Sequence, residues 1–532
     1  MLCVNFLFLW LEQCLVTIAQ TFQKDEHDVP GPVTEQERKR IMDTKQQQKR
    51  QSIKLEVFPL AQKSRGCQLH ILENCLYVGV VIGWVLYYAI LETWRVSEAN
   101  VFNLRRSGQL VAGWNIFQIF HQDVSCIPWK FWKEFLANSL LPFAVAYILL
   151  GQIVGLVNQK RKYYISVIIS SVMIGVTVGW QFLAFIMAFT SMGFLVSLLK
   201  RPSLVWLFTL GEILLFGIAT ISKQWLQYVS HPGLALVCLG TSSFRLFSFG
   251  LEYCKQAGRF QDQKQRINFN FTDLLKYNFY FPVFVAGPLM SYDQFMLQLQ
   301  RRRSNRFWLR FRTSIPDIVL CLSVILLVEI ATHFCYFYGL AKSASIVKNM
   351  NPSTAAGIIF WCVLHQYLIY FVLYEYSAAI ARFDDLELPR PPACVFSYFT
   401  FRDYWRLADR GMYNMVVKYI YIPFVQTTPT LMMKSLGALC CFGFMAAWHG
   451  GERHHLLWAT LCWLGIQVEV FAVVLFEMRF LKRITVKVPP QLSRRIQGLF
   501  WCPVFLLLVV VHMLLILGSS TWDILYILAS QN

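Results

Sequence analysis

A histidine stands at the end of a membrane-length apolar segment, where a titratable side chain is costly. Residues Leu431–Trp448 are apolar apart from one lysine and one serine, and His449 follows directly, with Gly450 and a second glycine after it. Imidazole changes its protonation near neutral pH, so it can take or give a proton. The glycines leave space beside the ring for a substrate. A polar residue in such a segment indicates a functional site.

A compact polar block lies about one helical hairpin upstream of His449. It reads Tyr-Trp-Arg-Leu-Ala-Asp and contains Trp405, Arg406 and Asp409. Because Arg406 and Asp409 are three positions apart, they would share one face of a helix. There they would either form a local ion pair or, together with Trp405, line a polar cavity.

A histidine and a carboxylate suit acyl transfer from a thioester. This reaction needs a group that takes the proton of the nucleophile, and donors for the developing oxyanion. Other acyl-transfer signatures are missing, because the sequence has no GxSxG, HxxxxD or DHHC motif. Three further histidines lie in apolar segments, namely His333, His365 and His512. Residue type alone does not choose among the four.

The composition indicates an integral membrane protein. Of the 532 residues, 56% are hydrophobic and 15% are charged, whereas soluble chains are about 25% charged. Apolar runs near ~20 residues recur, and each can cross a bilayer as a helix whose backbone groups pair internally. We therefore expect an all-α, polytopic helical bundle with re-entrant segments. The expected spans are Cys75–Leu91, Leu136–Val157, Tyr164–Trp180, Phe182–Leu199, Leu204–Ile221, Gly233–Glu252, Ile315–Tyr338, Ala355–Ala381, Leu431–His449, Leu456–Phe476 and Leu499–Leu517.

Two further apolar stretches are too short to cross a bilayer. Tyr280–Met290 contains Pro282 and a Gly-Pro pair, which predicts a broken or re-entrant segment that needs protein or a watery cavity around it. Met412–Val425 is apolar and aromatic, and we expect Pro423 to end it as an interfacial or re-entrant helix.

The N-terminal region differs from the rest of the chain. Residues 1–20 contain a short apolar stretch without a basic flank, which makes a poor signal peptide. A polar stretch rich in Gln and Lys follows. We expect residues 1–74 to be a partly disordered extension and residues 75–530 to be one integral-membrane domain.

The net charge of +19 comes largely from basic clusters between the apolar runs. Such loops usually face the cytosol, so we interpret the charge as topological and expect no nucleic-acid partner. The segment Arg301–Arg312 holds six arginines, and we expect it on the cytosolic side near an acyl-CoA entrance. The 15 cysteines lack paired metal-binding spacing, so most should be core residues.

At these residues the chain resembles the membrane-bound O-acyltransferase superfamily. Within it, the resemblance is strongest to the branch that contains the hedgehog acyltransferases, because most other members carry Asn at the position of Asp409. The matching stretches are Tyr280–Pro282, Ala286–Pro288, Pro392–Gly411, Tyr419–Pro423 and Trp448–Gly451.

The resemblance implies a protein-cysteine N-palmitoyltransferase of the endoplasmic reticulum membrane, or of the Golgi. Such an enzyme moves palmitate from palmitoyl-CoA to the α-amine of an N-terminal cysteine on a secreted signalling protein. His449 and Asp409 carry over as the catalytic pair, and Trp405 as a wall or gate. Arg406, Trp448 and Gly450 would contact substrate. Cys394 carries over as the thiolate ligand of a haem b.

Two other functions remain open from the sequence. One is a lysophospholipid or sterol acyltransferase of the same superfamily, which Asp409 in place of Asn disfavours. The other is a transporter whose intramembrane His and ion pair serve transport, although no symmetry between the halves of the chain favours it. A paralogous branch of the resembled family lacks the histidine, and His449 argues against that branch.

Overall fold

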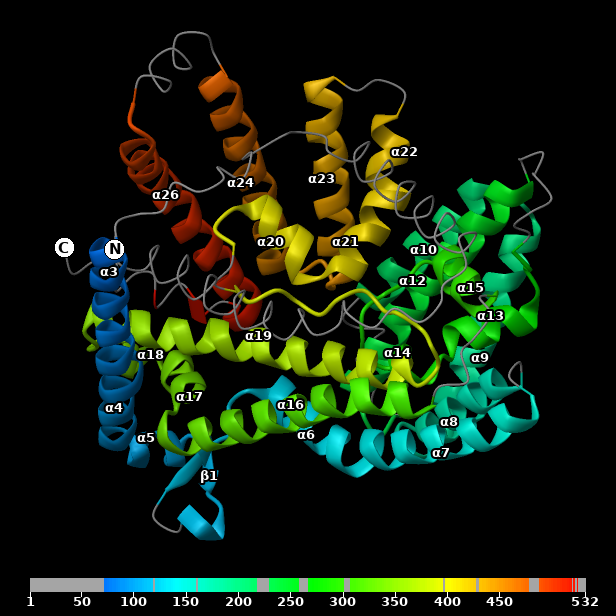
Figure 1. Ribbon diagram of the computed structural model, residues 1–532, viewed down its shortest axis with the longest axis horizontal. Coiled ribbons are helices and arrows are strands. Elements are labelled where there is room, and N and C mark those ends of the chain that lie inside the picture. The colour runs from blue at the N-terminus through cyan, green and yellow to red at the C-terminus, as the bar shows by residue number, and fades with distance from the viewer. Residues whose placement is uncertain are drawn as a thin grey trace. The chain divides into compact units, whose positions relative to one another are not determined.

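The computed structural model describes residues 71–117, 120–158, 161–217, 229–257, 267–300, 307–395, 398–426, 430–477, 488–518, 520, 521 and 524. Within these residues the fold is almost entirely helical (Figure 1). Nine helices there are long and apolar enough to cross a membrane. The prediction of a polytopic helical bundle is confirmed. The expected extension, residues 1–74, lies almost wholly outside the described residues, as do Arg301, Arg302, Arg303 and Arg306.

The helices follow one another in a chain of long apolar elements and short connecting ones. Their bounds are α3 Ile71–Trp84, η1 Val85–Glu92, α4 Thr93–Ala99, α5 Val101–Arg106, η2 Asn115–Phe117, α6 Ile127–Phe135, η3 Leu136–Leu140, α7 Leu141–Val157, α8 Lys162–Thr177, α9 Trp180–Leu198, α10 Pro202–Gly217, α12 Pro232–Ala257, α13 Phe271–Asn278, α14 Phe281–Phe284, α15 Tyr292–Gln300, α16 Phe307–Phe334, α17 Phe337–Lys342, α18 Ala344–Val347, α19 Pro352–Arg382, α20 Phe401–Ala408, α21 Arg410–Val416, η6 Val417–Tyr421, α22 Ile422–Val425, α23 Leu431–Trp448, α24 Arg453–Glu477 and α26 Pro490–Leu517.

The structure departs from the expected elements at three places. The expected span Tyr164–Trp180 is the 16-residue α8, which at about 1.5 Å per residue is shorter than a bilayer core of about 30 Å. Two short antiparallel strands, β1 Leu110–Ala112 and β2 His121–Asp123, pair in the connection between the first two expected spans, whereas the expected fold class was all-α. The third departure is the stretch around Pro423, which does not end its helix.

Proline is accommodated by a π-helical turn. The helix from α21 to α22 continues through Pro423 to Val425, because the five-residue π segment η6 precedes it. Proline lacks an N–H and displaces the carbonyl four residues earlier, and a π turn absorbs that mismatch. The segment η3 does the same before Pro142 at the start of α7.

The stretch Tyr280–Met290 is broken, as predicted, and it is enclosed by protein. It holds only the four-residue α14 and then runs without helix through Gly287, whose φ is 147°. Arg245 of α12 is fully buried, and its guanidinium donates to the carbonyls of Asn278, Val283 and Phe284. These bonds satisfy backbone groups that a helix would otherwise pair.

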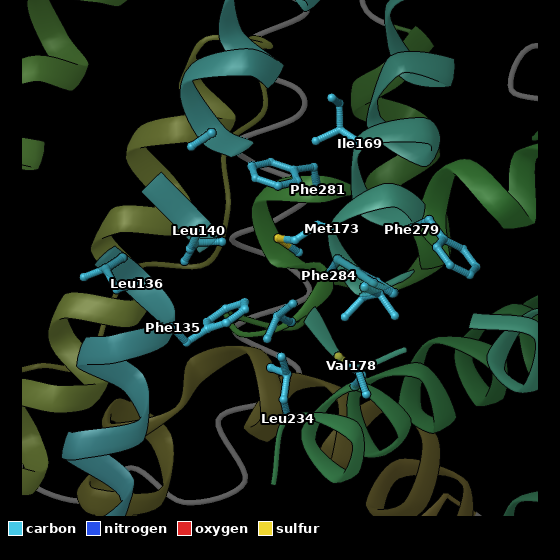
Figure 2. Packing of buried hydrophobic residues seen from close by; sticks show 14 of the residues in the cluster. Phe135, Leu136, Leu140, Ile169, Met173, Val178, Leu234, Phe279, Phe281 and Phe284 are labelled. Atoms are coloured by element: carbon cyan, nitrogen blue, oxygen red, sulfur yellow. The ribbon is translucent and has the colours of Figure 1, made fainter. Parts of the chain in front are cut away.

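The chain divides into two compact units. The larger contains Val85–Val395, Phe401–Ile466 and Leu507–Asn532, and every candidate site residue belongs to it. Its main core packs α7, α8, α14 and part of α12 around aromatic and aliphatic side chains. Figure 2 shows Phe281 and Phe284 of the broken segment among these side chains, close to Met173 of α8. The core therefore fixes the broken segment on one side.

Candidate active site

His449 caps α23 at the point where the chain leaves the helix. Its N–H still donates to Met445 O at 3.0 Å, and Gly450 and Gly451 follow with φ of 108° and 68°. A residue with a side chain is strained at such angles, so the glycines allow a sharp exit. A Cβ at either glycine would meet nothing within 4 Å. Open space therefore adjoins His449.

Aromatic rings surround the His449 imidazole. Its centroid lies 4.9 Å from Trp448, 5.3 Å from Trp458 and 5.6 Å from His455. The ring centroid of Trp405, on α20, lies 5.4 Å from that of Trp458. Trp405 and His449 therefore both contact Trp458. Burial, followed by the neighbouring histidines, lowers the pKa of His449 to about 4. The imidazole is therefore neutral at pH 7 and can accept a proton.

Trp448 joins this group to α12. Its ring lies 5.4 Å from Phe244, and its indole N–H donates to Gly240 O at 3.4 Å. A Cβ at Gly240 would approach the indole to 3.2 Å, so the glycine permits this close packing. Trp448 thus fixes the end of α23, and with it the position of His449.

Asp409 begins α21 as its N-cap. One carboxylate oxygen accepts from Met412 N at 2.8 Å, and the other accepts from the Tyr374 hydroxyl of α19 at 2.5 Å. Burial raises the pKa of the Asp409 carboxyl above its ordinary range, and these hydrogen bonds partly offset that rise. The residue as a whole is half-buried. Among the described residues no hydrogen bond or ion pair joins it to His449.

The prediction that Arg406 and Asp409 share one face of a helix is wrong. Helix α20 ends at Ala408, and Asp409 adopts φ −144° and ψ 91°, which is extended backbone. Asp is a strong N-cap, and its bond to Met412 starts a new helix instead of continuing the old one. No ion pair between Arg406 and Asp409 occurs among the residues described. Arg406 is exposed.

The broken segment packs directly on the start of α21. A Cβ at Gly411, two residues after Asp409, would lie 2.4 Å from Leu289 O. Ser377, one helical turn after Tyr374 on α19, donates to Ala286 O at 2.9 Å. The segment is therefore held between α19 and α21, and it fixes the backbone next to Asp409. The sequence pattern predicted the break but not this contact.

The match to a family model settles the class of the protein. The model of the membrane-bound O-acyltransferase family covers residues 222–517, more than half of the chain and all of the residues described above from α12 to α24. The chain belongs to this family. It is a multi-pass membrane acyltransferase, as the sequence patterns predicted.

Three relatives narrow the likeness within the membrane-bound O-acyltransferases. The chain is 25% identical to the mouse protein-cysteine N-palmitoyltransferase HHAT, over 80% of this chain and 86% of the relative. It is 23% identical to mouse HHAT-like protein, over 71% and 75%. It is 24% identical to Drosophila melanogaster protein-cysteine N-palmitoyltransferase Rasp, over 75% and 78%. The predicted resemblance to this branch is confirmed.

Two of the three other histidines in apolar helices, His333 and His365, are held by contacts within the protein. His333 bonds Glu329 O through one ring nitrogen and accepts from Trp114 N through the other. His365 is buried among the rings of Trp129, Phe337 and Tyr338. These contacts favour His449, which adjoins open space, as the reactive histidine.

Sequence reasoning missed several side chains near the candidate site. Tyr374 lies in the apolar run of α19 and was not predicted as a site residue, although a tyrosine hydroxyl in a membrane helix indicates a polar partner. Trp458 was hidden in α24. His512 of α26, which accepts or donates at 2.9 Å to Tyr404, was counted only as a lone histidine. Their partners are distant in sequence, so no local pattern could identify them.

Cys394 lies in an irregular segment that follows Pro391 and Pro392. The residue is half-buried, and the preceding N–H, of Ala393, donates to Leu407 O at 3.1 Å. An accessible cysteine fits the chemistry of an axial thiolate ligand. Within the described part of the chain no three His, Cys, Asp or Glu residues form a metal-binding group. The family likeness does not itself support haem, which stays a prediction.

We expect Cys394→Ala to remove Soret absorbance from the purified protein, because the haem would lose its axial thiolate. The measurement is the absorbance spectrum at matched protein concentration, with Cys441→Ala of α23 as the control. A wild-type protein without this absorbance, or a Cys394→Ala protein with an unchanged spectrum, leaves Cys394 as a packing residue.

Proposed function

We propose that this acyltransferase transfers palmitate from palmitoyl-CoA to the α-amine of an N-terminal cysteine on a secreted protein, in the endoplasmic reticulum membrane. His449 and Asp409 are its catalytic residues. The observation that carries the proposal is their geometry. A neutral imidazole adjoins open space at the end of α23, and the carboxylate of Asp409 is held by Tyr374 and Met412 at the start of α21.

The chemistry of an amine acceptor explains why a carboxylate is needed. An N-terminal α-ammonium has a pKa near ~8 and must lose one proton before it attacks. A carboxylate whose pKa is raised by burial is a better acceptor for that proton than an ordinary one. Asp409 therefore binds the ammonium and takes or relays its proton.

The transfer forms a C–N bond and breaks a C–S bond. The neutral amine nitrogen attacks the thioester carbonyl and the C–S bond breaks. One of its two N–H protons passes through the neutral His449 to the coenzyme A sulfur, and the other stays on the amide. The indole N–H of Trp458, whose ring contacts His449, has no hydrogen-bond partner in the described structure. It is the donor that we assign to the oxyanion.

Arginines near Asp409 suit the phosphates of palmitoyl-CoA. Burial, with the positive charges of Arg390 and Arg406, lowers the pKa of the Arg410 guanidinium. Like charges held together favour an anionic ligand. We therefore keep Arg406 as a substrate-binding residue, now with Arg390 and Arg410 as neighbours instead of Asp409.

Two relatives, HHAT and Rasp, are protein-cysteine N-palmitoyltransferases, which favours a protein acceptor over a lysolipid. The second candidate, a lysophospholipid acyltransferase, would need an acceptor hydroxyl. A hydroxyl carries no positive charge, so it does not use the ammonium-binding role that we assign to Asp409. The amine acceptor uses both candidate residues, and we prefer it for that reason.

A peptide whose N-terminal cysteine is α-acetylated, with a free thiol, is expected to receive no palmitate. The stable product of the proposed reaction is an amide, and acetylation blocks its nitrogen. The unmodified peptide with the same sequence is the control, and product is measured by mass spectrometry. Transfer to the acetylated peptide, as a hydroxylamine-labile thioester, would contradict N-acylation.

A further inference from the structure

Helix α19 presents a tyrosine hydroxyl to the Asp409 carboxylate. Tyr374 is buried, and its hydroxyl donates to Asp409 Oδ2 at 2.5 Å. The other oxygen, Oδ1, accepts from Met412 N at 2.8 Å. A helix N-cap needs only one side-chain oxygen. The bond from Met412 is therefore enough to begin α21, and the bond from Tyr374 has another role.

A second carboxylate with tyrosine partners shows what differs at Asp409. The Asp384 carboxylate accepts from the hydroxyls of Tyr147 and Tyr280. It also forms an ion pair with Lys162, whose Nζ lies 2.5 Å from Oδ1. Within the described residues no lysine or arginine pairs with Asp409, whose partners are one hydroxyl and backbone N–H groups. The protein therefore leaves the negative charge of Asp409 available to a cationic group of the substrate.

The turn of α19 that carries Tyr374 is fixed by the broken segment. Ser377, one turn further along α19, donates to Ala286 O at 2.9 Å. A Cβ at Gly287 would lie 2.9 Å from the Ser377 hydroxyl oxygen, so helix and segment are in close contact. A side chain on such a rigid element is held in one orientation. The Tyr374 hydroxyl can therefore fix the direction in which the Asp409 carboxylate points.

We propose that Tyr374 is a positioning residue for the reaction, which orients the Asp409 carboxylate toward the ammonium of the acceptor and holds it in its charged form. This inference rests on the proposed function, in which Asp409 binds that ammonium. The hydroxyl and the Met412 N–H each use one lone pair of a different oxygen, and the remaining lone pairs receive the ammonium. A neutral donor suits this role, because a lysine in its place would compete with the substrate.

Tyr374→Phe removes the hydroxyl and keeps the ring. We expect kcat for a Cys-starting peptide to fall about tenfold or more, because a misdirected catalytic group costs rate. The KM for the peptide should change by less than about threefold, since the carboxylate remains to attract the ammonium. Tyr376→Phe is the matched control on the same helix, because the Tyr376 hydroxyl is buried and has no hydrogen-bond partner in the described structure. Wild-type kcat in Tyr374→Phe overturns the proposal.

The groups around the Asp409 carboxylate limit what can set its ionisation. Tyr374 and Tyr370 of α19 interact with it. Helix α21 supplies backbone N–H groups, and the broken segment faces this turn with backbone atoms. Arg406 of α20 and Arg410 of α21 are close to it in sequence, and neither forms an ion pair with it among the described residues. Of these side chains, Tyr374 is the one that hydrogen-bonds the carboxylate.

The pH profile separates positioning from a loss of packing. Burial raises the pKa of Asp409, and the hydrogen bonds from Met412 and Tyr374 lower it. Without the Tyr374 hydroxyl the pKa rises further, so the charged carboxylate is lost at a higher pH as the pH falls. We expect the acidic limb of kcat/KM to move to higher pH in Tyr374→Phe and to stay in place in Tyr376→Phe. The ionisation of the peptide amine is common to all three enzymes. A limb that does not move overturns the proposal.

An infrared measurement makes the test independent of turnover. The carbonyl band of the protonated Asp409 carboxyl is identified by its absence in Asp409→Asn, and its pH midpoint is compared between variants. We expect a higher midpoint in Tyr374→Phe than in wild type or Tyr376→Phe, and equal midpoints overturn the proposal. Should Tyr374→Phe fold poorly, a fluorinated tyrosine at position 374 is a stronger donor and should lower the midpoint. If wild-type protein acylates no Cys-starting peptide, the proposed function fails, while this comparison still decides whether Tyr374 controls Asp409.

Discussion

His449→Ala is expected to abolish palmitoyl transfer while the protein still folds. Removing a catalytic acid–base group typically costs about 10²–10⁴-fold in rate. His449 makes ring contacts but anchors no element through its side chain, and alanine is compatible with its helical backbone. The measurement is the initial rate with palmitoyl-CoA and a Cys-starting peptide, at equal amounts of folded protein.

A neighbouring histidine provides the control for this change. His454 is partly exposed and lies 3.5 Å from the Glu452 carboxylate. The initial rate of His454→Ala should therefore stay within about twofold of the wild-type rate. A His449→Ala enzyme that stays within about twofold of wild type would remove His449 from the mechanism.

The pH dependence gives a second readout of His449. Burial lowers its pKa to about 4, so the neutral imidazole persists above that pH and is lost as the pH falls through it. We expect no inflection from His449 near its ordinary pKa of about 6.5. An inflection there that disappears in His449→Gln would contradict the buried, neutral imidazole.

Asp409→Asn is expected to lose most amine acylation, by about 10²-fold or more. Asparagine caps helices as well as aspartate does, so the bond from Met412 and the start of α21 should survive. It cannot take a proton or pair with an ammonium. Asp409→Asn is therefore a chemical change with little structural cost. Rates with the Cys-starting peptide, at matched thermal stability, measure the effect.

Asp273→Asn is the matched control for this substitution. Asp273 is a buried carboxylate in the first turn of α13 and pairs with Lys276 at 2.9 Å, away from the candidate site. A normal rate in Asp409→Asn would leave Asp409 as a helix cap only. A loss of folded protein, instead of a loss of rate, would favour the structural role.

The sequence predicted the membrane helices well because their signal is local. Each apolar run must satisfy its own backbone, so length and hydropathy suffice to find α9, α19 or α23. The break at Tyr280–Met290 was predictable for the same reason, since proline and glycine act on their own segment. The position of α14 and its contact with Gly411 were not predictable, because they depend on packing against helices that are distant in the sequence.

The candidate site was predictable in its residues but not in its arrangement. His449 and Asp409 stand out as polar groups in or beside apolar segments. The spacing of Arg406 and Asp409 suggested one helix face, yet the capping tendency of aspartate ended α20 and began α21. Tyr374 and Trp458 lie inside apolar helices, and only the packing of those helices reveals what they face.

The most direct test of the central claim is mass spectrometry of the product made by purified protein from palmitoyl-CoA and a Cys-starting peptide. The account predicts a peptide that carries palmitate on its α-amine as a hydroxylamine-resistant amide, and no such product with His449→Ala. Palmitate found only on the thiol, or only on an added lysolipid while the peptide stays unmodified, would contradict it.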